Sequence, residues 1–180
     1  KMKFSAKQKG TALGMLIGFL AALTVVILGT RFNPFQINPA ADDFQELRIA
    51  AISVILVCGF LVFSIGRIAR HRFFSADDID GAGLTTGTAK VKLLQAELQN
   101  TVEQTLLATI VYFSWAILLP STWILVIPLA ALSFAIGRIL FFAGYSGGAP
   151  SRAAGFAMTF FPSVLMLILI IYNITLSLSA

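Results

Sequence analysis

Residues 153–177 read AAGFAMTFFPSVLMLILIIYNITLS, an apolar run of 25 residues that contains no charged side chain. As an α-helix rising 1.5 Å per residue, this run extends for about 37 Å. The hydrocarbon core of a bilayer is about 30 Å thick, so the run is long enough to cross it. The stretch therefore predicts a transmembrane helix, and the rest of the chain has to be compatible with a membrane protein.

Four further apolar stretches precede this run. They lie at residues 11–29, 49–68, 105–119 and 123–144, and an amphipathic segment at 91–103 leads into the third. The apolar part of the third stretch has only 15 residues, whereas a span needs about 20. Its helix must therefore bring Asn100 and Glu103 to the membrane boundary or below it. The pattern predicts an all-α integral membrane protein with five transmembrane helices.

The composition of the chain excludes several other classes of protein. Hydrophobic residues make up 58% and charged residues 12% of the 180 residues, against about 45–50% and about 25% in soluble domains. Disorder requires the opposite balance, and a disulfide scaffold is excluded because Cys58 is the only cysteine. The net charge is +5, but no basic patch is interleaved with aromatic residues, so we expect no nucleic-acid partner.

The positions of the basic residues predict the orientation of the helices. If the five stretches cross the membrane alternately, eleven Lys and Arg residues lie on one side and two on the other. Lys and Arg are retained in cytoplasmic loops. We therefore expect the N-terminus inside, in the inner or plasma membrane if the protein is bacterial. The smaller group is Arg31 and Arg48; the larger is Lys1, Lys3, Lys7, Lys9, Arg67, Arg70, Arg72, Lys90, Lys92, Arg138 and Arg152.

The first apolar stretch has two interpretations. Basic residues ahead of an apolar core are also typical of a secretory signal peptide. The core here has about 18 residues, which is long for the 7–15 of a signal peptide. We therefore expect a retained helix.

Polar residues near the ends of the later stretches form a candidate anion site on the same side of the membrane. Asn100 and Glu103 are three residues apart and share one helix face. Arg138 lies inside the fourth stretch, with Glu103 as the nearest candidate partner in depth. Tyr145 closes that stretch and Arg152 opens the next, where guanidinium and helix-start amides both favour negative charge.

Each of these residues also has a purely structural interpretation. Glu103 can lie in the solvated boundary, and Arg138 can extend its guanidinium to the lipid headgroups. Tyr145 is also typical of an interfacial aromatic belt, and Arg152 of a topology signal.

Acidic residues and histidine supply no recognisable metal site. Residues 77–81 read DDIDG and lack the spacing and the terminal Glu of a calcium-binding loop, so they predict a solvated turn. His71 has no second His or Cys beside it. We expect no metal site in this protein.

Two segments resemble motifs of the MAPEG family, the membrane-associated proteins in eicosanoid and glutathione metabolism. Residues 96–104, AELQNTVEQ, resemble the family signature Arg-x-x-x-Asn-x-x-Glu. Residues 138–152 resemble the corner between the family's third and fourth helices, where an Arg, two Tyr four residues apart and a second Arg seven residues further on recur. Two positions depart from the pattern, since Ala96 replaces the first Arg and Phe141 the first Tyr. Lys92, one helical turn before Ala96, is a candidate for the missing cation.

The resemblance implies a four-helix bundle at residues 48–180, after an N-terminal basic segment, extra transmembrane helix and loop at 1–47, in a bacterial-type member. It implies a homotrimer that binds glutathione, as co-substrate, between subunits near the cytoplasmic side. Arg152 resembles the arginine that stabilises the glutathione thiolate, and Gln104 stands where an aromatic residue often occurs. The other residues for which the resemblance suggests glutathione contacts are Asn100, Glu103, Tyr145, Arg70, Arg72, Arg138 and Lys92.

The implied activity is a glutathione transferase that conjugates the thiolate to hydrophobic electrophiles, in a detoxification role, with peroxidase activity toward lipid hydroperoxides as a second reaction. Two other functions remain open. One is a non-catalytic lipid-binding protein of the same family, and the other is a small transporter or channel.

The orientation can be tested by reporter fusions. Fusions after Lys9, Gly87 and Gly148 should report the cytoplasm, because the basic segments flank these positions. A fusion after Ala40 should report the opposite side. A cytoplasmic signal at Ala40 would contradict the arrangement.

Overall fold

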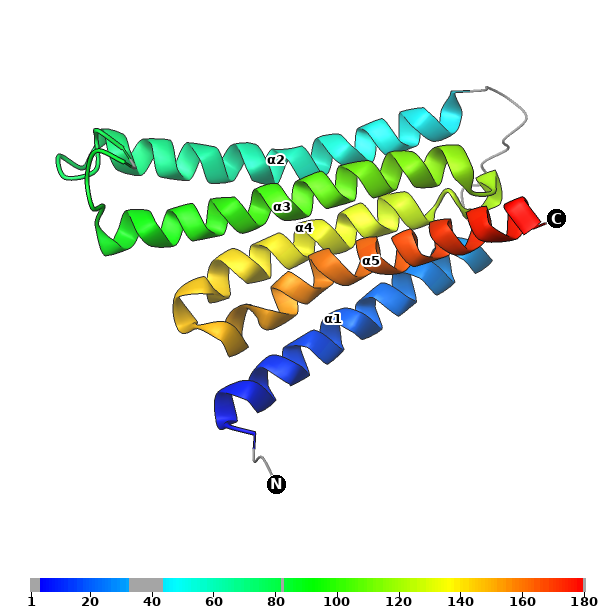
Figure 1. The fold of residues 1–180 in the computed structure, drawn as a ribbon, viewed down its shortest axis with the longest axis horizontal. Helices are drawn as coiled ribbons and strands as arrows, with labels where there is room; N and C mark the ends of the chain where they lie inside the picture. Colours follow the sequence, from blue (N-terminus) through cyan, green and yellow to red (C-terminus); the bar gives the residue numbers. More distant parts are fainter. Residues whose placement is uncertain (1–3, 33–43, 82, 180) are drawn as a thin grey trace.

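The computed structural model of the chain describes residues 4–32, 44–81 and 83–179 and consists of five long helices (Figure 1). Short 3₁₀ turns precede the last two helices, at Ser121–Trp123 (η2) and Tyr145–Gly147 (η3). The helices are α1 (Ala6–Arg31), α2 (Gln45–Phe73), α3 (Ala89–Leu118), α4 (Val126–Gly144) and α5 (Ala149–Ser179).

All five predicted spans are confirmed, because each helix is long and apolar enough to cross a membrane. The helices continue beyond the apolar runs at most of their ends. The extension matters most in α3, which begins at Ala89 and is continuous through the polar segment at 96–104. Asn100 and Glu103 therefore lie within a helix and not in a loop. Lys1, Lys3 and the part of the predicted loop at 33–43 lie outside the described residues.

Side chains at two helix starts satisfy backbone donors that have no partner within the helix. The Ser5 hydroxyl accepts from the amide of Gln8, whose side chain accepts in return from the amide of Ser5. The Thr88 hydroxyl caps α3 by accepting from the amide of Val91. These caps fix where α1 and α3 begin.

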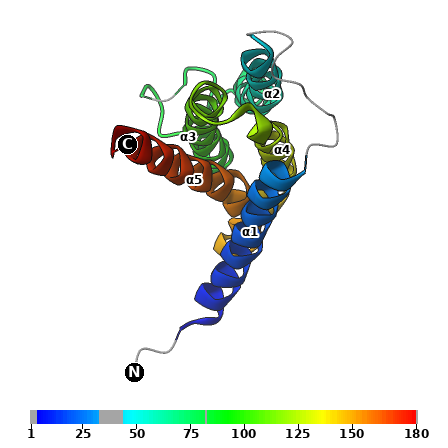
Figure 2. The same cartoon turned by 90° about the vertical axis from the view of Figure 1, so that its right-hand side faces the viewer.

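Helices α2 to α5 form the bundle, and α1 lies against its outside (Figures 1 and 2). Within the bundle, the closest packing is between α4 and α5 and between α2 and α3. Helix α1 packs chiefly along α5 and also touches α4. Its start lies beside the turn between α4 and α5, so the N-terminal end of α1 and this turn occupy the same end of the molecule (Figure 1).

Small residues allow α1 and α5 to approach closely. Gly14, Gly18 and Ala22 are buried at four-residue spacing on one face of α1. A Cβ atom placed on Gly18 would lie 2.6 Å from the Ala157 carbonyl carbon and 2.8 Å from the Met158 nitrogen. Backbones in such close contact are typical of small-xxx-small packing between membrane helices.

The main apolar core and a group of buried polar side chains occupy different levels of the bundle. The apolar core surrounds Tyr112 and Trp115 of α3, Phe134 of α4 and Met166 of α5. Closer to the loop between α2 and α3, several buried side chains are polar, beside a small apolar cluster of Ile68, Val91 and Leu94. The polar residues at this level are Ser64, Glu97, Thr101, Gln104, Arg138 and Thr159.

Asp77 and Asp80, in the connection between α2 and α3, are exposed as expected of a solvated turn, but Asp78 between them is buried. Its side chain is only 1% exposed. The carboxylate accepts from the Thr88 hydroxyl at 2.6 Å and from the Thr88 amide at 2.8 Å, and it also contacts Ser75 and His71. The hydrogen bonds from Thr88 hold the pKa of Asp78 at about 2, below its ordinary value. The ionised Asp78 carboxylate therefore stabilises the fold at neutral pH, and this contribution is lost as the pH falls toward 2.

The contact between α1 and α5 can be tested by adding one methyl group. Gly18→Ala should lower the free energy of unfolding by roughly 1–3 kcal/mol, because the methyl group meets backbone atoms that cannot rotate away. The control is Gly66→Ala on α2, where an added Cβ has nothing within 4 Å. The control should be neutral or stabilising, since Ala favours a helix by about 1 kcal/mol over Gly. Thermal unfolding in detergent measures both, and equal effects would refute the close contact.

Candidate functional site

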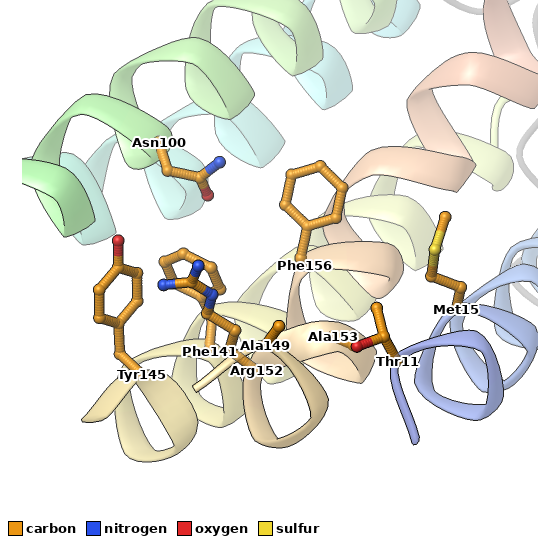
Figure 3. A pocket seen from close by; sticks show the side chains of 9 residues that line it. All are labelled: Thr11, Met15, Asn100, Phe141, Tyr145, Ala149, Arg152, Ala153 and Phe156. Atoms are coloured by element: carbon orange, nitrogen blue, oxygen red, sulfur yellow. The ribbon is translucent and has the colours of Figure 1, made fainter. Parts of the chain in front are cut away.

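A cavity of about 340 Å³ lies between α1, α3, α4 and α5 at the end of the bundle near the turn between α4 and α5 (Figure 3). The cavity brings together three residues singled out in the sequence, Asn100, Tyr145 and Arg152. Asn100 comes from α3, and the other two come from either side of the turn between α4 and α5. The remaining lining residues are Thr11, Met15, Phe141, Ala149, Ala153 and Phe156.

The turn between α4 and α5 brings Arg152 back over Tyr145. Helix α4 ends in the 3₁₀ turn at Tyr145–Gly147, and Gly148 then has a φ of 89°, a conformation that favours glycine. Helix α5 starts at the next residue, so Arg152 lies in its first turn. The guanidinium carbon lies 4.3 Å from the centroid of the Tyr145 ring, a cation–π contact. The Arg152 side chain forms no hydrogen bond with the described residues, so its N–H groups are available to a ligand.

A second guanidinium lies buried behind the wall of the cavity. Arg138 is fully buried, and its Nη1 donates to Asn100 Oδ1 at 3.0 Å. Its Nη2 donates to the Thr159 hydroxyl at 2.8 Å, and its charge lies 4.3 Å from the centre of the Phe141 ring. Among the residues that the structure describes, it forms no ion pair. A buried cation without a carboxylate partner leaves a positive potential in the adjacent low-dielectric space.

Arg138 also determines how Asn100 presents its amide group. Because a guanidinium can only donate, the atom that it contacts on Asn100 is the amide oxygen. The amide nitrogen is then left as a donor on the residue that lines the cavity. Together with Arg152, this arrangement gives the cavity N–H donors at one end, and two positive charges favour an anion there.

The partner of Arg138 differs from the expected one. Glu103 is exposed on α3, and its carboxylate accepts a hydrogen bond from the Gln99 amide group at 2.8 Å. Arg138 instead contacts Asn100, because positions 100 and 103 diverge around the helix and only Asn100 faces α4. Asn100 and Glu103 were predicted to share one helix face, but Asn100 lines the cavity and Glu103 is exposed on the outside of the bundle.

An ion pair between a buried carboxylate and a partly exposed guanidinium was missed in the sequence. Glu97 of α3 is 2% exposed and contacts Arg67 of α2 at 2.5 Å, and the Arg67 guanidinium also lies over the ring of Phe142. Arg67 had been counted among the loop cations, but α2 continues to Phe73 and carries it inside the span. Glu97 lies next to Ala96 in the polar segment at 96–104. An acidic residue in a membrane-spanning helix was the signal that could have predicted a basic partner.

The other predicted ligand residues lie away from the cavity within one chain. Arg70 lines a separate surface hollow with Arg67, His71 and Lys90. Arg72 and Lys92 line a third hollow, along the connection between α2 and α3. Gln104 is buried one turn beyond Asn100, and its Oε1 has no hydrogen-bond partner among the described residues.

Five cavity residues had not been considered as site residues: Thr11, Met15, Ala149, Ala153 and Phe156. Phe156 follows Arg152 by one helical turn, which places both on the same face of α5. Thr11 and Met15 belong to α1, which had been interpreted as an addition to the bundle. Thr11 and Met15 are four residues apart, beside Gly14 and Gly18, which have the same spacing. This pattern was the signal that one face of α1 packs against another helix.

Comparison with known proteins gives one match. A model of the MAPEG family matches residues 49–172, which is more than half of the chain. No curated protein and no solved structure matches the chain. The matched residues begin near the start of α2 and end within α5, so they exclude α1.

The role of Arg138 in presenting Asn100 can be separated from a role in folding. Removing the guanidinium leaves the Asn100 amide oxygen and the Thr159 hydroxyl without their buried donor, which destabilises the fold by about 1–3 kcal/mol. Arg138→Met should therefore lower the thermal stability of the protein and also weaken the binding of glutathione, used here as an anionic probe, by roughly 10-fold or more, since a charge-assisted contact contributes about 1.5–3 kcal/mol. Arg138→Lys should bind with intermediate affinity. Unchanged affinity in Arg138→Met, measured by isothermal titration calorimetry, would leave Arg138 with a structural role only.

Proposed function

The chain belongs to the MAPEG family, the membrane-associated proteins in eicosanoid and glutathione metabolism, and from this premise we propose that it is a glutathione transferase. The reaction is conjugation of the glutathione thiolate to hydrophobic electrophiles. The observation that carries the proposal is the cavity in which Arg152 lies over Tyr145 and faces Asn100, with Arg138 buried behind them.

The proposed chemistry needs a thiolate at neutral pH. A free thiol has a pKa of about 8.5, and a nearby positive charge lowers it. The available N–H groups of Arg152 are suited to hold the sulfur anion, and the guanidinium stays charged at any working pH. The thiolate sulfur then attacks the electrophilic carbon. A sulfur–carbon bond forms, and the electron pair of the broken bond departs with the leaving group.

The two substrates reach the cavity from different phases in this proposal. Glutathione carries two carboxylates and a thiol and arrives from water. An apolar electrophile dissolves in the bilayer and enters between the helices. The cavity suits this pairing, because its N–H donors are at one end and Phe156 and Ala153 lie toward the other (Figure 3).

We also propose that the protein works as a homotrimer with the site on the cytoplasmic side. Arg70, Arg72 and Lys92 lie outside the cavity of their own chain. Assembly with a second copy would give these cations a role at a site shared between subunits. The long apolar α2, few of whose residues are buried in one copy, supports such packing.

The alternative function is lipid binding without turnover. Ala96 and Phe141 occupy the places of a cation and a tyrosine in the family pattern. Phe141 adds an apolar surface to the cavity, which favours an apolar ligand. Under this alternative, the protein would bind lipid and form no thiolate when glutathione is added.

Substitution of Arg152 distinguishes the two functions. Arg152→Ala should lower the conjugation rate and the ultraviolet thiolate absorbance, because a charge-assisted hydrogen bond to the sulfur is lost. Such a bond is worth roughly 1.5–3 kcal/mol, which corresponds to a roughly 10- to 150-fold loss. Arg152→Lys should lose less but still be impaired, because the planar guanidinium is absent.

The matched control is Arg31→Ala at the exposed C-terminal end of α1, outside the cavity, which should form thiolate at the wild-type level. Native mass spectrometry from mild detergent should show three copies in every variant. Wild-type rates and absorbance in Arg152→Ala would exclude its catalytic role and favour the lipid-binding function.

A further inference from the structure

We propose that α1, which lies outside the part of the chain that matches the family, forms the apolar wall of the electrophile site, and that Met15 sets the size of the electrophile accepted there. The inference rests on the proposed function for the identity of the ligand. The location of an apolar ligand beside Met15 is a separate claim that can be tested without glutathione.

Two residues of α1 complete the cavity. Thr11 and Met15 line it together with residues of α3, α4 and α5. Both precede the matched range of 49–172. They lie on the side of the cavity that faces away from Asn100 of α3 (Figure 3). This chain therefore has a wall that the matched residues alone do not supply.

The wall is held in a fixed position. Gly14 lies against α5 so closely that an added Cβ would be 2.7 Å from the Ala153 Cβ and 2.8 Å from the Ala154 nitrogen. One turn later the contact is repeated at Gly18, and Phe19 packs edge-on against Phe161 with ring centroids 5.6 Å apart. These contacts flank Met15 on the same helix. A helix packed this closely cannot shift outward to admit a larger ligand without losing the contacts.

The N–H donors lie at one end of the cavity. Asn100, Tyr145 and Arg152 lie at this end, Phe156 projects into the middle, and Met15 and Thr11 lie at the other end (Figure 3). The Thr11 hydroxyl donates to the Lys7 carbonyl of its own helix at 2.9 Å. A thiolate held by Arg152 would therefore have its electrophile on the side of Phe156 and Met15. A volume of about 340 Å³ is near the lower limit of ligand sites, about 300–1,000 Å³. The dimensions favour a compact aromatic or short-chain electrophile.

Met15 is suited to define this boundary. A thioether side chain is flexible and makes favourable contacts with aromatic rings. Shortening it enlarges the apolar end of the cavity, whereas a bulkier residue fills that end. Neither change touches the residues at the polar end.

The first experiment compares Met15→Ala and Met15→Trp with the same two substitutions at Leu16. Like Met15, Leu16 is an exposed apolar residue of α1, but it does not line the cavity. The substrates are the compact 1-chloro-2,4-dinitrobenzene and the larger trans-stilbene oxide. Met15→Ala should raise kcat/KM for the larger substrate relative to the smaller by about 10-fold, within the range seen for small changes in apolar sites. Met15→Trp should shift the ratio the other way. Thiolate absorbance with glutathione alone should be unchanged in all four variants.

The second experiment needs no glutathione. The wild-type protein is photolabelled with the apolar probe 3-trifluoromethyl-3-phenyldiazirine, with and without excess unreactive trans-stilbene, and the labelled residues are mapped by mass spectrometry. Labelling of Met15 and Phe156 should be competed by stilbene, and labelling of Leu16 should not be.

The outcomes separate the two claims. If stilbene competes only with the labelling of Met15 and Phe156, the result supports α1 as the wall of an apolar ligand site. If the same protein forms no thiolate with glutathione, only the proposed transferase function fails. Thiolate formation with uncompeted labelling at Met15, or an equal change of the substrate ratio in the Met15 and Leu16 variants, overturns the inference.

Discussion

The buried guanidinium of Arg138 is the constraint on which the buried polar residues of this protein depend. A charge inside a membrane-spanning bundle is costly unless polar groups surround it. Here the groups come from two other helices, Asn100 on α3 and the hydroxyl of Thr159 on α5, while Arg138 itself is on α4. One side chain thus links three helices, and it can do so only where they meet. That meeting point lies directly behind the cavity.

The separation of apolar and polar buried residues follows from this constraint. Away from Arg138, apolar residues such as Trp115, Tyr112 and Met166 fill the bundle. Around Arg138, hydrogen-bonding groups on Asn100 and Thr159 accompany the rings of Phe134 and Phe141. A second buried charge, Glu97, is paired with Arg67. Polar side chains are therefore concentrated at one end of the bundle, where α1 and the turn between α4 and α5 surround the cavity. The same end carries the N–H donors that the proposed thiolate site requires.

The fold was largely predictable, and the site was predictable in part. The five spans follow from apolar length alone, because a bilayer leaves a long apolar segment few alternatives to a helix. Tyr145 and Arg152 were found because residues on either side of one helix–helix turn remain close in space, and Asn100 was found from the motif in the polar segment at 96–104. The partner of Arg138 was not found, because it depends on the rotation of α3 about its axis. The contribution of Met15 was not found, because nothing local to α1 shows which helix it packs against.

The amino-acid sequence by itself determined the membrane class, the number of helices and the presence of basic groups beside the Gly147–Gly148 turn. These features follow from apolar length and local spacing, which act within one helix or one turn. Only the tertiary structure decided that Asn100 faces the cavity while Glu103 faces outward, that Asp78 is buried, and that α1 closes the site. Each of these depends on contacts between segments distant in the chain. Such contacts are set by how close backbones can approach and by which buried polar groups find partners, and no single segment carries that information.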